Sequence, residues 1–479
     1  MANDYMRTEA RWNNIKAVMG WDIGDGDSVA FIKRIAGGDN VLRPLYLHKS
    51  RDVQVIKSAV SQNSSGFITI GEDAAKQQEF AINFKCSPEN WDQQYAMGLT
   101  YRQHMRNYIR GISEAILQNS SNRDILGSII VKDGKGNMHW KKDEVLLAVG
   151  CPSSAIWKGE NIRRQYAELI SEVTGISNVF VIEESYATVF SLVENNDVSE
   201  KINLQTGVLV LDFGSSTANA TYTMPRKKVV NIIWELGAAQ VENAMLEYIL
   251  HSSKAKKLLS NMAKMYGKEK ALVVKNRPKK LLSKIAKKYG KERILVVKND
   301  CIHAVFQLKL DKEDYFDGKL GKDAVVKNVS IPIMDENGDR FLDEDGEPTM
   351  LTISYHVTDE MMRYALDEYK FHVKKNGVFA NYGTWKENCW KFLNDVKLTL
   401  ERENITVQTV IVTGGGSQMP FVVKLSNKVF PEKTIPSDTP SYSVVKGLVT
   451  IAYNEVQQMG AAHNRGISIV KTTGYKRGE

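Results

Sequence analysis

Apolar runs that end in a turn of small and acidic residues recur three times along the chain. Residues 15–32 read as a strand, the turn DIGDGDS and a second strand. Residues 208–223 repeat this design around the turn DFGSST, and residues 409–417 place the turn TGGGS after a third apolar run. Short apolar runs bounded by turn signals indicate buried strands. We therefore expect two β-hairpins that carry an acidic residue before the turn, and one strand that leads through glycines into a helix.

Between these turns the apolar spacing alternates between the periods of strands and helices. Residues 145–149 and 179–182 are further buried-strand patterns, and apolar residues recur every three or four positions in longer segments. The main predicted helices cover residues 160–174, 184–193, 358–374, 384–403 and 441–458. Strands that alternate with helices over 479 residues predict an α/β protein with more than one core.

Charge is distributed unevenly along the chain. The formal net charge is +8, but residues 254–298 contain sixteen Lys or Arg and two Glu, a local excess of +14 that leaves −6 for the remainder. This segment holds a tandem repeat, residues 256–276 and 279–299, identical at sixteen of twenty-one positions. Each copy reads as an amphipathic helix and a short strand. The repeat is either a solvated helical surface or a contact surface for an acidic protein, another subunit or nucleic acid.

The sequence carries no signal for secretion or for a membrane span. Residues 1–14 are polar and lack the apolar core of a signal peptide, and no apolar run is long enough to cross a bilayer. The four cysteines, Cys86, Cys151, Cys301 and Cys389, are far apart and form no CxxC pair. This spacing favours free thiols in a reducing compartment, so we expect a cytoplasmic protein.

The three turns are suited to a phosphate chain. A tight bend presents several backbone N–H groups to an anion, and Asp22 and Asp212 offer the oxygen ligands that a hydrated Mg²⁺ prefers. The glycines of the third turn let a ligand approach bare backbone. Neither the Walker GxxxxGK[ST] spacing nor the Rossmann GxGxxG spacing occurs. The turns therefore predict a nucleotide clamp on a different fold.

As a set, these motifs resemble the actin-like ATPase superfamily, which includes actin, sugar kinases and the seventy-kilodalton heat-shock chaperones. DIGDGDS is similar to its first phosphate motif, DFGSST to its second, VIVTGGGSQMP to its adenosine motif and IEESYATVFSL to its connecting motif. GEDAAKQQEFAINFK and LGAAQVENAMLEYIL resemble the ATPase domain of the chaperones most closely. The resemblance covers residues 15–250 and 385–460.

The resemblance implies a two-lobed α/β fold, in which duplicated mixed β-sheets are flanked by helices and the nucleotide lies in a central cleft. The first lobe would comprise residues 1–200, with a C-terminal helix in 438–479 returning to it. The second lobe would comprise residues 201–437, with the basic tandem repeat of residues 256–299 in its upper subdomain.

The resemblance also implies ATP or ADP and Mg²⁺ as ligands, and a role for each motif residue. Lys85 would contact the γ-phosphate, Glu184 would position the attacking water, and Asp22 and Asp212 would hold Mg²⁺ through water. The other expected nucleotide contacts are Gly24, Asp25, Gly26, Gly214, Ser215, Ser216, Thr217, Gly237, Asp300, His303, Gly414, Gly415 and Gly416. Asp300, His303 and Gln307 have the spacing of the residues that grip adenosine in the chaperones, although none is identical.

The chain departs from the chaperone pattern at three positions in the turns. Asp25 and Asp27 replace Thr and Asn, and they add negative charge beside a triphosphate. Asn219 replaces a second Asp; it can form hydrogen bonds but carries no charge. Phosphoryl transfer depends on electrostatic positioning, so the loss of a carboxylate can lower the rate of hydrolysis more than it lowers binding.

We expect a Mg-dependent ATPase whose lobes open and close with the nucleotide state and so control a partner or an assembly. Only about twenty residues follow the last predicted helix, too few for the peptide-binding domain of a chaperone. Two alternatives stay open. The chain could be a filament-forming actin-like protein, for DNA segregation or cell organisation, or a nucleotide-binding scaffold with little turnover.

Overall fold

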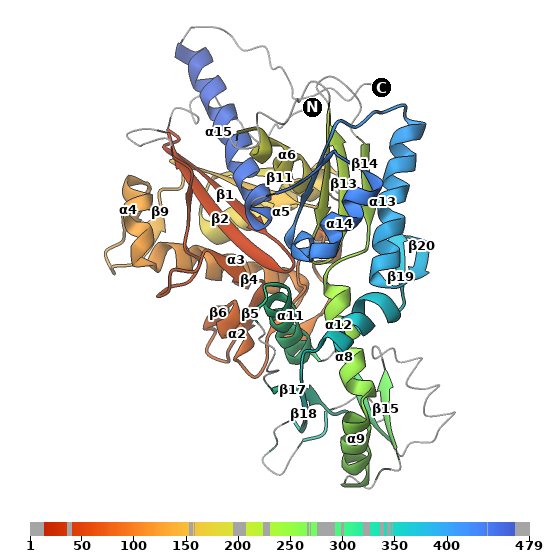
Figure 1. Cartoon of the computed structure of the whole chain (residues 1–479). Helices are drawn as coiled ribbons and strands as arrows, with labels where there is room; N and C mark the ends of the chain where they lie inside the picture. The colour runs from red at the N-terminus through yellow and green to blue at the C-terminus, as the bar shows by residue number, and fades with distance from the viewer. Residues whose placement is uncertain are drawn as a thin grey trace. The chain divides into compact units, whose positions relative to one another are not determined.

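The structure is a computed structural model of the whole chain, shown in Figure 1. It describes residues 14–35, 41–152, 157, 159–194, 207–223, 230–265, 268, 270–274, 293–297, 301–319, 326–335, 340–342, 346, 348–437 and 439–464. Contacts divide the chain into two compact units. Unit 1 comprises Met1–Gly237, Val373–Ala380 and Cys389–Glu479, and unit 2 comprises Ala238–His372 and Asn381–Asn388.

The first sheet of unit 1 is built on the predicted hairpin of β1 and β2. Its strand order is β11-β10-β1-β2-β3, and β4 pairs with β2 beside it. The strands are β1 (Ala17–Ile23), β2 (Asp27–Arg34), β3 (Arg43–Pro44), β4 (Val55–Lys57), β10 (Val145–Cys151) and β11 (Asn178–Glu183). β2 is antiparallel to β1 and to β3, whereas β10 is parallel to β1 and to β11. All seven residues of β10 are buried, as its continuous apolar run predicts for a central strand.

The second sheet is built on the hairpin of β12 and β13, and its order is β20-β19-β14-β13-β12-β21-β22. The strands are β12 (Val208–Phe213), β13 (Ala218–Thr223), β14 (Val230–Trp234), β19 (Phe371–Lys375), β20 (Val378–Gly383), β21 (Thr409–Thr413) and β22 (Thr434–Pro436). β13 is antiparallel to β12 and to β14, and β21 is parallel to β12 and to β22.

The two sheets share one plan. In the first sheet, β3 pairs antiparallel with β2, β2 pairs antiparallel with β1, and β10 and β11 follow in parallel on the other side of β1. In the second sheet, β14, β13, β12, β21 and β22 have the same arrangement. This duplicated mixed-sheet arrangement is the one that the resemblance to actin-like ATPases implies, and it confirms the predicted α/β fold class. The lobe boundaries at residues 200 and 437 stay a prediction, because the first sheet and all of the second except the ends of β19 and β20 belong to unit 1.

Helices and smaller strands complete the architecture. The helices are α2 (Glu72–Ala75), α3 (Tyr101–Gln118), α4 (Arg123–Leu126), α5 (Glu160–Thr174), α6 (Glu184–Glu194), α8 (Ala239–His251), α9 (Ser253–Met265), α11 (Ile302–Phe316), α12 (Asp359–Arg363), α13 (Trp385–Arg402), α14 (Pro420–Val429) and α15 (Ser443–Asn464). The smaller strands of unit 1 are β5 (Ala59–Gln62), β6 (Ile68–Ile70), β7 (Ala81–Ile82), β8 (Ile130–Lys132) and β9 (Met138–Trp140). Gly175 caps α5 in the left-handed conformation, as predicted.

Helix α15 crosses α6 and covers one face of the β1–β2 hairpin (Figure 1). Val445, Leu448 and Val449 of α15 join Val18 of β1 in a buried apolar cluster. The crossing with α6 is close at Gly447, where an added Cβ would lie 1.7 Å from the backbone oxygen of Ala187. A C-terminal helix therefore packs on the first sheet, next to the helix that begins at Glu184.

The predicted helix over residues 358–374 is wrong in its second half. Helix α12 continues through a π-helical turn only to Glu368, and strand β19 begins at Phe371. From there Phe371 and Val373 are buried while His372 and Lys374 are exposed. This alternation has the two-residue period of a strand. The segment contains no proline that would mark the end of the helix, so the change of period is the signal that separates the helix from the strand.

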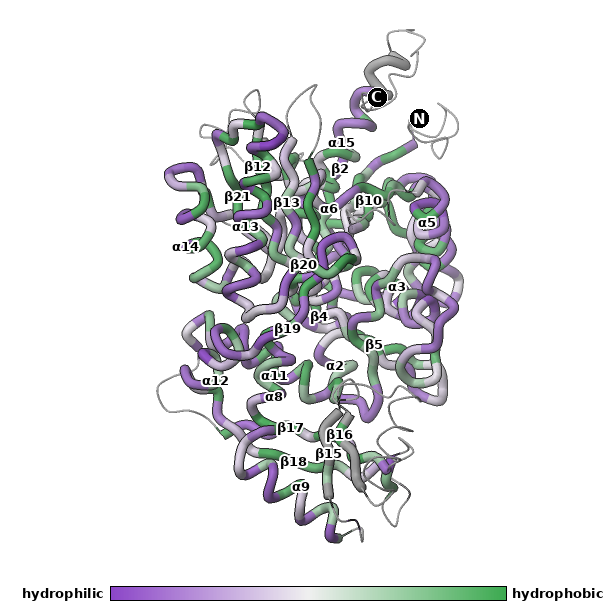
Figure 2. The backbone as a smooth tube through the Cα atoms, turned by 90° about the vertical axis from the view of Figure 1, so that its right-hand side faces the viewer, coloured by the Kyte–Doolittle hydropathy of each residue, from purple (hydrophilic) through white to green (hydrophobic). Residues whose placement is uncertain are grey.

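Unit 2 contains the described parts of the basic repeat. The first copy forms α9 and β15 (Lys270–Val274), and the second contributes β16 (Arg293–Val297), which pairs with β15 in parallel. The helix predicted for the second copy lies outside the described residues. Ala255, Leu259 and Ala263 are the buried face of α9, and its lysines are exposed. The first copy is therefore the amphipathic unit that its sequence predicts; Figure 2 shows the alternating hydropathy of α9.

A paired set of buried charges lies between α8, α11 and the hairpin of β17 (Lys327–Pro332) and β18 (Met350–Tyr355) in unit 2. Lys312 donates to Glu242, and Asp311 accepts from Lys327 and Tyr355. Because each of these charges has a partner, removal of one partner would leave an uncompensated charge inside unit 2.

None of the helices within the described residues combines the length and the apolar character needed to cross a bilayer. Cys86, Cys151, Cys301 and Cys389 are all free thiols.

Candidate functional site

The first turn (residues 22–28) and the second turn (residues 212–217) close in the same way. In the first, the backbone N–H of Gly24 donates to the oxygen of Asp27 at 3.0 Å, and in the second, Gly214 donates to Thr217 at 2.8 Å. An added Cβ on Gly24 would lie 2.5 Å from that Asp27 oxygen, so the first turn requires glycine. Asp22 and Asp212 occupy equivalent places, two residues before each closing glycine. The two predicted phosphate motifs are thus matching hairpins.

The two turns meet within unit 1. The hydroxyl of Ser216 donates to Oδ2 of Asp25 at 2.6 Å, a direct hydrogen bond from the second turn to the first. Gly237 lies against the second turn, because a Cβ there would come within 1.9 Å of the Ser215 oxygen. The structure therefore brings Gly24, Asp25, Ser216 and Gly237 into one region, as the motifs predict.

The third turn (residues 413–417) follows β21, which pairs in parallel with β12 so that Thr413 lies opposite Asp212. Gly414 has a φ of +84°, and an added Cβ would lie 2.2 Å from Oδ1 of Asp212. A Cβ on Gly416 would lie 2.9 Å from the Phe213 oxygen, whereas one on Gly415 would meet nothing within 4 Å. Bare backbone at 414 and 416 thus lets the third turn touch the start of the second, and Gly415 faces open space.

Lys85 and Glu184 form an ion pair beside these turns. Their Nζ and Oε1 atoms are 2.7 Å apart, and the Lys85 side chain is only 4% exposed. Glu184 is the first residue of α6, and the absence of a side chain at Gly150 makes room for it: a Cβ there would lie 2.9 Å from its Cγ. Burial opposes the charge on Lys85, but Glu184, Asp22 and Asp25 outweigh this and raise the pKa of the lysine above its usual range.

Asp22 and Asp212 lie in the field of the same glutamate. Burial and the charge of Glu184 raise the pKa of Asp22 to about 8, with a further contribution from Asp212. Burial and Glu184 also raise the pKa of Asp212 to about 7, against a hydrogen bond from Asn219 that lowers it. Glu184 and Asp22 thus share the buried Lys85, and Asp212 lies in the field of Glu184. An additional cation would stabilise the ionised forms of these carboxyl groups.

The donor set fits a hydrated divalent cation. Mg²⁺ prefers oxygen ligands and keeps several of its waters, and Asp22 and Asp212 are carboxylates with excess negative charge around them. Within the described ranges, no group of three His, Cys, Asp or Glu side chains could hold a metal ion directly. Binding of Mg²⁺ through water by Asp22 and Asp212 stays a prediction.

Sequence reasoning missed two residues that support the first turn, one at the end of β4 and one directly after it. The hydroxyl of Ser58 donates to the oxygen of Gly24 at 2.6 Å, and its backbone N–H donates to Gly26 at 3.0 Å. Nζ of Lys57 lies 3.0 Å from Oδ1 of Asp27. Strand β4 follows the turn by some thirty residues, and no local motif indicates that it returns beside β2. The pairing with Lys57 relieves the extra charge at Asp27.

The predicted adenosine residues are not part of the described region of unit 1. His303 and Gln307 lie on α11 in unit 2, and Asp300 lies outside the described residues. Gln307 donates to Asp311 at 2.9 Å within that unit. A role for these three residues in binding adenosine therefore stays a prediction.

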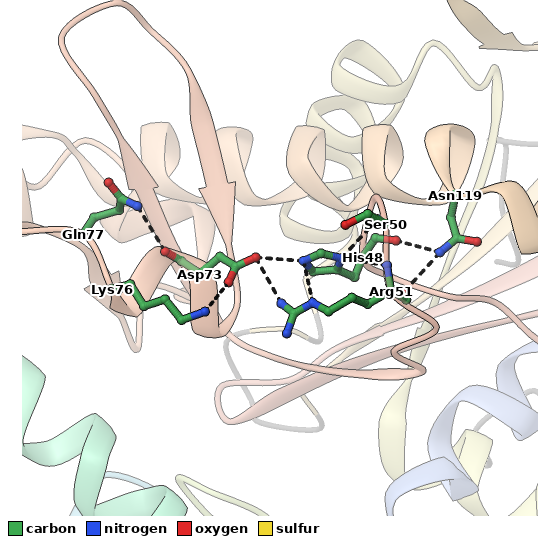
Figure 3. A network of polar contacts seen from close by, with 7 residues as sticks. All are labelled: His48, Ser50, Arg51, Asp73, Lys76, Gln77 and Asn119. Atoms are coloured by element: carbon green, nitrogen blue, oxygen red, sulfur yellow. Dashed lines mark hydrogen bonds and ion pairs between the residues drawn. The ribbon is translucent and has the colours of Figure 1, made fainter.

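The motif GEDAAK, which supported the resemblance to chaperones, belongs to a separate polar network. Figure 3 shows Asp73 accepting from His48 at 2.8 Å, Arg51 at 3.1 Å and Lys76 at 2.7 Å. Hydrogen bonds from Lys76 and His48 lower the pKa of Asp73 to about 2. Asn119, after α3, donates to the backbone oxygen of His48 at 2.8 Å. These contacts anchor the segment before β4 to helices α2 and α3, which is a structural role.

Comparisons with known proteins give similarity in structure only. No family model and no curated protein matches the sequence. Among solved structures, MreB5 of Spiroplasma citri bound to ADP is 13% identical, covering 93% of this chain and 99% of its own, with a TM-score of 0.47. The same protein bound to AMPPNP gives 13% identity, 94% and 99% coverage, and a TM-score of 0.47. The assignment of an actin-like fold therefore rests on the shared strand plan of the two sheets.

Proposed function

We propose that this protein binds ATP and ADP between its turns and hydrolyses ATP with Mg²⁺, as an actin-like ATPase. The observation that carries the proposal is the meeting of two matching hairpin turns, linked by the hydrogen bond from Ser216 to Asp25. Each hairpin places an aspartate before its turn, and the buried Lys85–Glu184 pair lies in the electrostatic field of both. Paired backbone turns with a fixed cation are what a phosphate chain requires.

The proposed role of each residue follows from its chemistry. Backbone N–H groups of the first and second turns would hold the phosphates, and the ammonium of Lys85 would neutralise charge on the terminal phosphate. Asp22 and Asp212 would hold Mg²⁺ through its waters. This ion would offset the charge of the phosphates when bound. Glu184, fixed by Lys85 at 2.7 Å, would orient the attacking water and accept its proton.

A thermal-shift and phosphate-release experiment on the full chain tests this function. Binding to the folded state increases the free energy of unfolding by RT ln(1 + [L]/Kd), so Mg·ATP and Mg·ADP are each expected to raise the melting temperature. Phosphate release is expected from the wild-type protein and not from Asp212→Ala. If neither nucleotide shifts the melting temperature of the wild-type protein, the proposed function is wrong.

Self-assembly is the second candidate, and strand β20 favours it. β20 is the last strand of the seven-stranded sheet, and no strand of the described residues pairs with its outer edge. Its sequence, VFANYG, has no charge or proline, and Val378 and Phe379 are 71% and 62% exposed. An uncharged apolar edge strand is a template for pairing with another chain.

Sedimentation with Mg·ATP and with Mg·ADP tests assembly. A pellet that depends on the nucleotide and is lost in Phe379→Lys would support assembly through β20. Leu398→Lys, at a site on α13 that is 50% exposed, is the matched control.

We further propose that the protein works in the cytoplasm and that its basic repeat contacts an acidic partner or another subunit; the exposed lysines of α9 support that contact.

A further inference from the structure

The two acids of the first turn face different surroundings. Asp25 accepts a hydrogen bond from Ser216 in the second turn. Burial chiefly raises the pKa of Cys86, and the charge of Asp25 adds to this; the same charge also contributes to the raised pKa of Lys85, after Glu184. Its carboxylate therefore lies near the lysine and the serine that the motifs assign to phosphate. A carboxylate and a phosphate accept the same charge-assisted hydrogen bonds.

Asp27, two residues later, points to another partner. It lies opposite Lys57 in the pairing of β2 with β4, and its Oδ1 atom is 3.0 Å from Nζ of that lysine. Its charge is thus neutralised within the first sheet. Of these two acids, Asp25 is the one that reaches across to the second turn.

We propose that the carboxylate of Asp25 is an internal ligand of the phosphate site, which an incoming phosphate group must displace. The carboxylate accepts the hydrogen bond from Ser216 and lies in the electrostatic field of Lys85, and so links the two turns. With nucleotide, two anions would compete for the same donors, and repulsion disfavours both remaining there. Asp25 then weakens nucleotide binding and limits it to high nucleotide concentrations. This inference rests on the proposed function.

Calorimetric titration of the full chain with Mg·ADP tests the inference. Asp25→Asn keeps the shape of the side chain and removes its charge, so it is expected to bind Mg·ADP about tenfold more tightly than wild type. Asp27→Asn removes the same charge from the same turn and is expected to stay within about twofold of wild type, because Asp27 faces Lys57. Asp25→Ser serves as a second variant if the asparagine variant does not fold.

A double variant separates the specific contact from general charge. In a Ser216→Ala background, Asp25→Asn is expected to tighten Mg·ADP binding by less than about threefold, because the donor that the carboxylate and the phosphate share is gone. Without nucleotide, Asp25→Asn is expected to melt at a lower temperature than wild type.

The outcomes distinguish the two ideas. Equal affinity of Asp25→Asn and wild type, weaker binding by Asp25→Asn, or the same gain in Asp27→Asn would overturn the internal ligand while leaving the proposed function in place. Absence of Mg·ADP binding in wild type and in every variant would overturn both. Binding by Asp25→Asn but not by wild type would support the blocking role of Asp25 and overturn the proposed function of the wild-type protein.

Discussion

Lys85 and Glu184 are 99 residues apart in the sequence, yet their side chains form the central ion pair of the candidate site. The pair needs three separate elements: the segment that carries the lysine, the start of α6 and the bare backbone of Gly150 in β10. Because Lys85 is almost fully buried, either partner left alone would be an uncompensated charge. The candidate site therefore places one buried lysine among several acidic side chains.

Replacing Glu184 tests its role in turnover. Glu184→Gln keeps a hydrogen-bond acceptor for Lys85 but removes the base, so the rate of phosphate release is expected to fall about 100-fold or more. Nucleotide affinity, measured by calorimetry, is expected to stay within about tenfold. Glu183→Gln is the matched control, since Glu183 pairs with Arg163 instead. Unchanged turnover in Glu184→Gln would remove this residue from the chemistry.

The raised pKa values of Asp22 and Asp212 predict a dependence of stability on pH. The folded values of about 8 and 7 lie above the ordinary value of 3.8, so the folded state binds more protons between about pH 4 and pH 8. The free energy of unfolding from these groups is therefore highest at low pH and falls as the pH rises through that interval, by up to about 1.4 kcal/mol per unit for each group.

Melting curves without nucleotide check this sign. Asp22→Asn and Asp212→Asn are expected to gain stability relative to wild type as the pH rises from 5 to 8. Added Mg²⁺ is expected to offset the loss in wild type and to have less effect on the variants. A difference between variant and wild type that stays constant over this pH interval would contradict the prediction.

Single residues differ in how far the sequence reveals them. Asp22 and Asp212 lie at the ends of strands and Gly414 follows one, each beside a recognisable turn, so their positions could be predicted. Ser58 and Lys57 could not, because their contact with the first turn depends on the return of β4 beside β2. The link between Asp25 and Ser216 joins two motifs 191 positions apart, which only the folded chain brings together.

Among the elements, helix α15 matters most for the site, because it holds α6 in place. The two helices cross where Gly447 meets the backbone of Ala187. Since α6 begins at Glu184, a shift of this crossing would move the glutamate relative to Lys85. The geometry of the ion pair therefore depends on a residue far from the turns.

Gly447→Ala is expected to destabilise the protein by about 1–3 kcal/mol, because its methyl group would overlap backbone rather than a flexible side chain. Chemical denaturation measures this, and phosphate release is expected to fall as well. Gly134→Ala is the control, since a Cβ there meets nothing within 4 Å. Equal stability of the two variants would show that the crossing tolerates a side chain.

Elements with a clear period were predicted well, and segments with mixed signals were not. The strand of residues 145–149 and the helix of residues 160–174 appear as β10 and α5. The segment from 358 to 374 contains both a helical turn and the strand β19, and its helix formers concealed the change of period at Phe371. Pairing with β14 at Trp234 helps to fix the strand, and that contact is not visible in the sequence.

At the scale of the whole molecule, a repeated strand plan and a local concentration of charge dominate. The strand plan could be predicted because both hairpins carry similar motifs. The division into units could not, since it depends on how contacts cluster rather than on motifs. The basic repeat stands out in the sequence, and its described parts, α9, β15 and β16, belong to unit 2.

The charge of the repeat predicts salt-dependent binding to polyanions. Changing Lys254, Lys256, Lys257 and Lys264 of α9 to glutamine is expected to lower the salt concentration at which the protein elutes from a heparin column. The same changes at Lys391, Lys397, Lys424 and Lys428, exposed on α13 and α14, form the control and are expected to have a smaller effect. Equal elution of both variants would mean that the repeat makes no special contribution.

The parallel pairing of β12 with β21 has a consequence for how the protein is made. Val208 pairs with Thr409, and all of Ala238–His372 is synthesised between them. While a ribosome is producing that insertion, the β12–β13 hairpin exists but lacks the neighbour that covers its other edge. The nascent chain therefore presents an open, apolar strand during much of translation, and it is at this stage that help from the folding machinery of the cell would matter most.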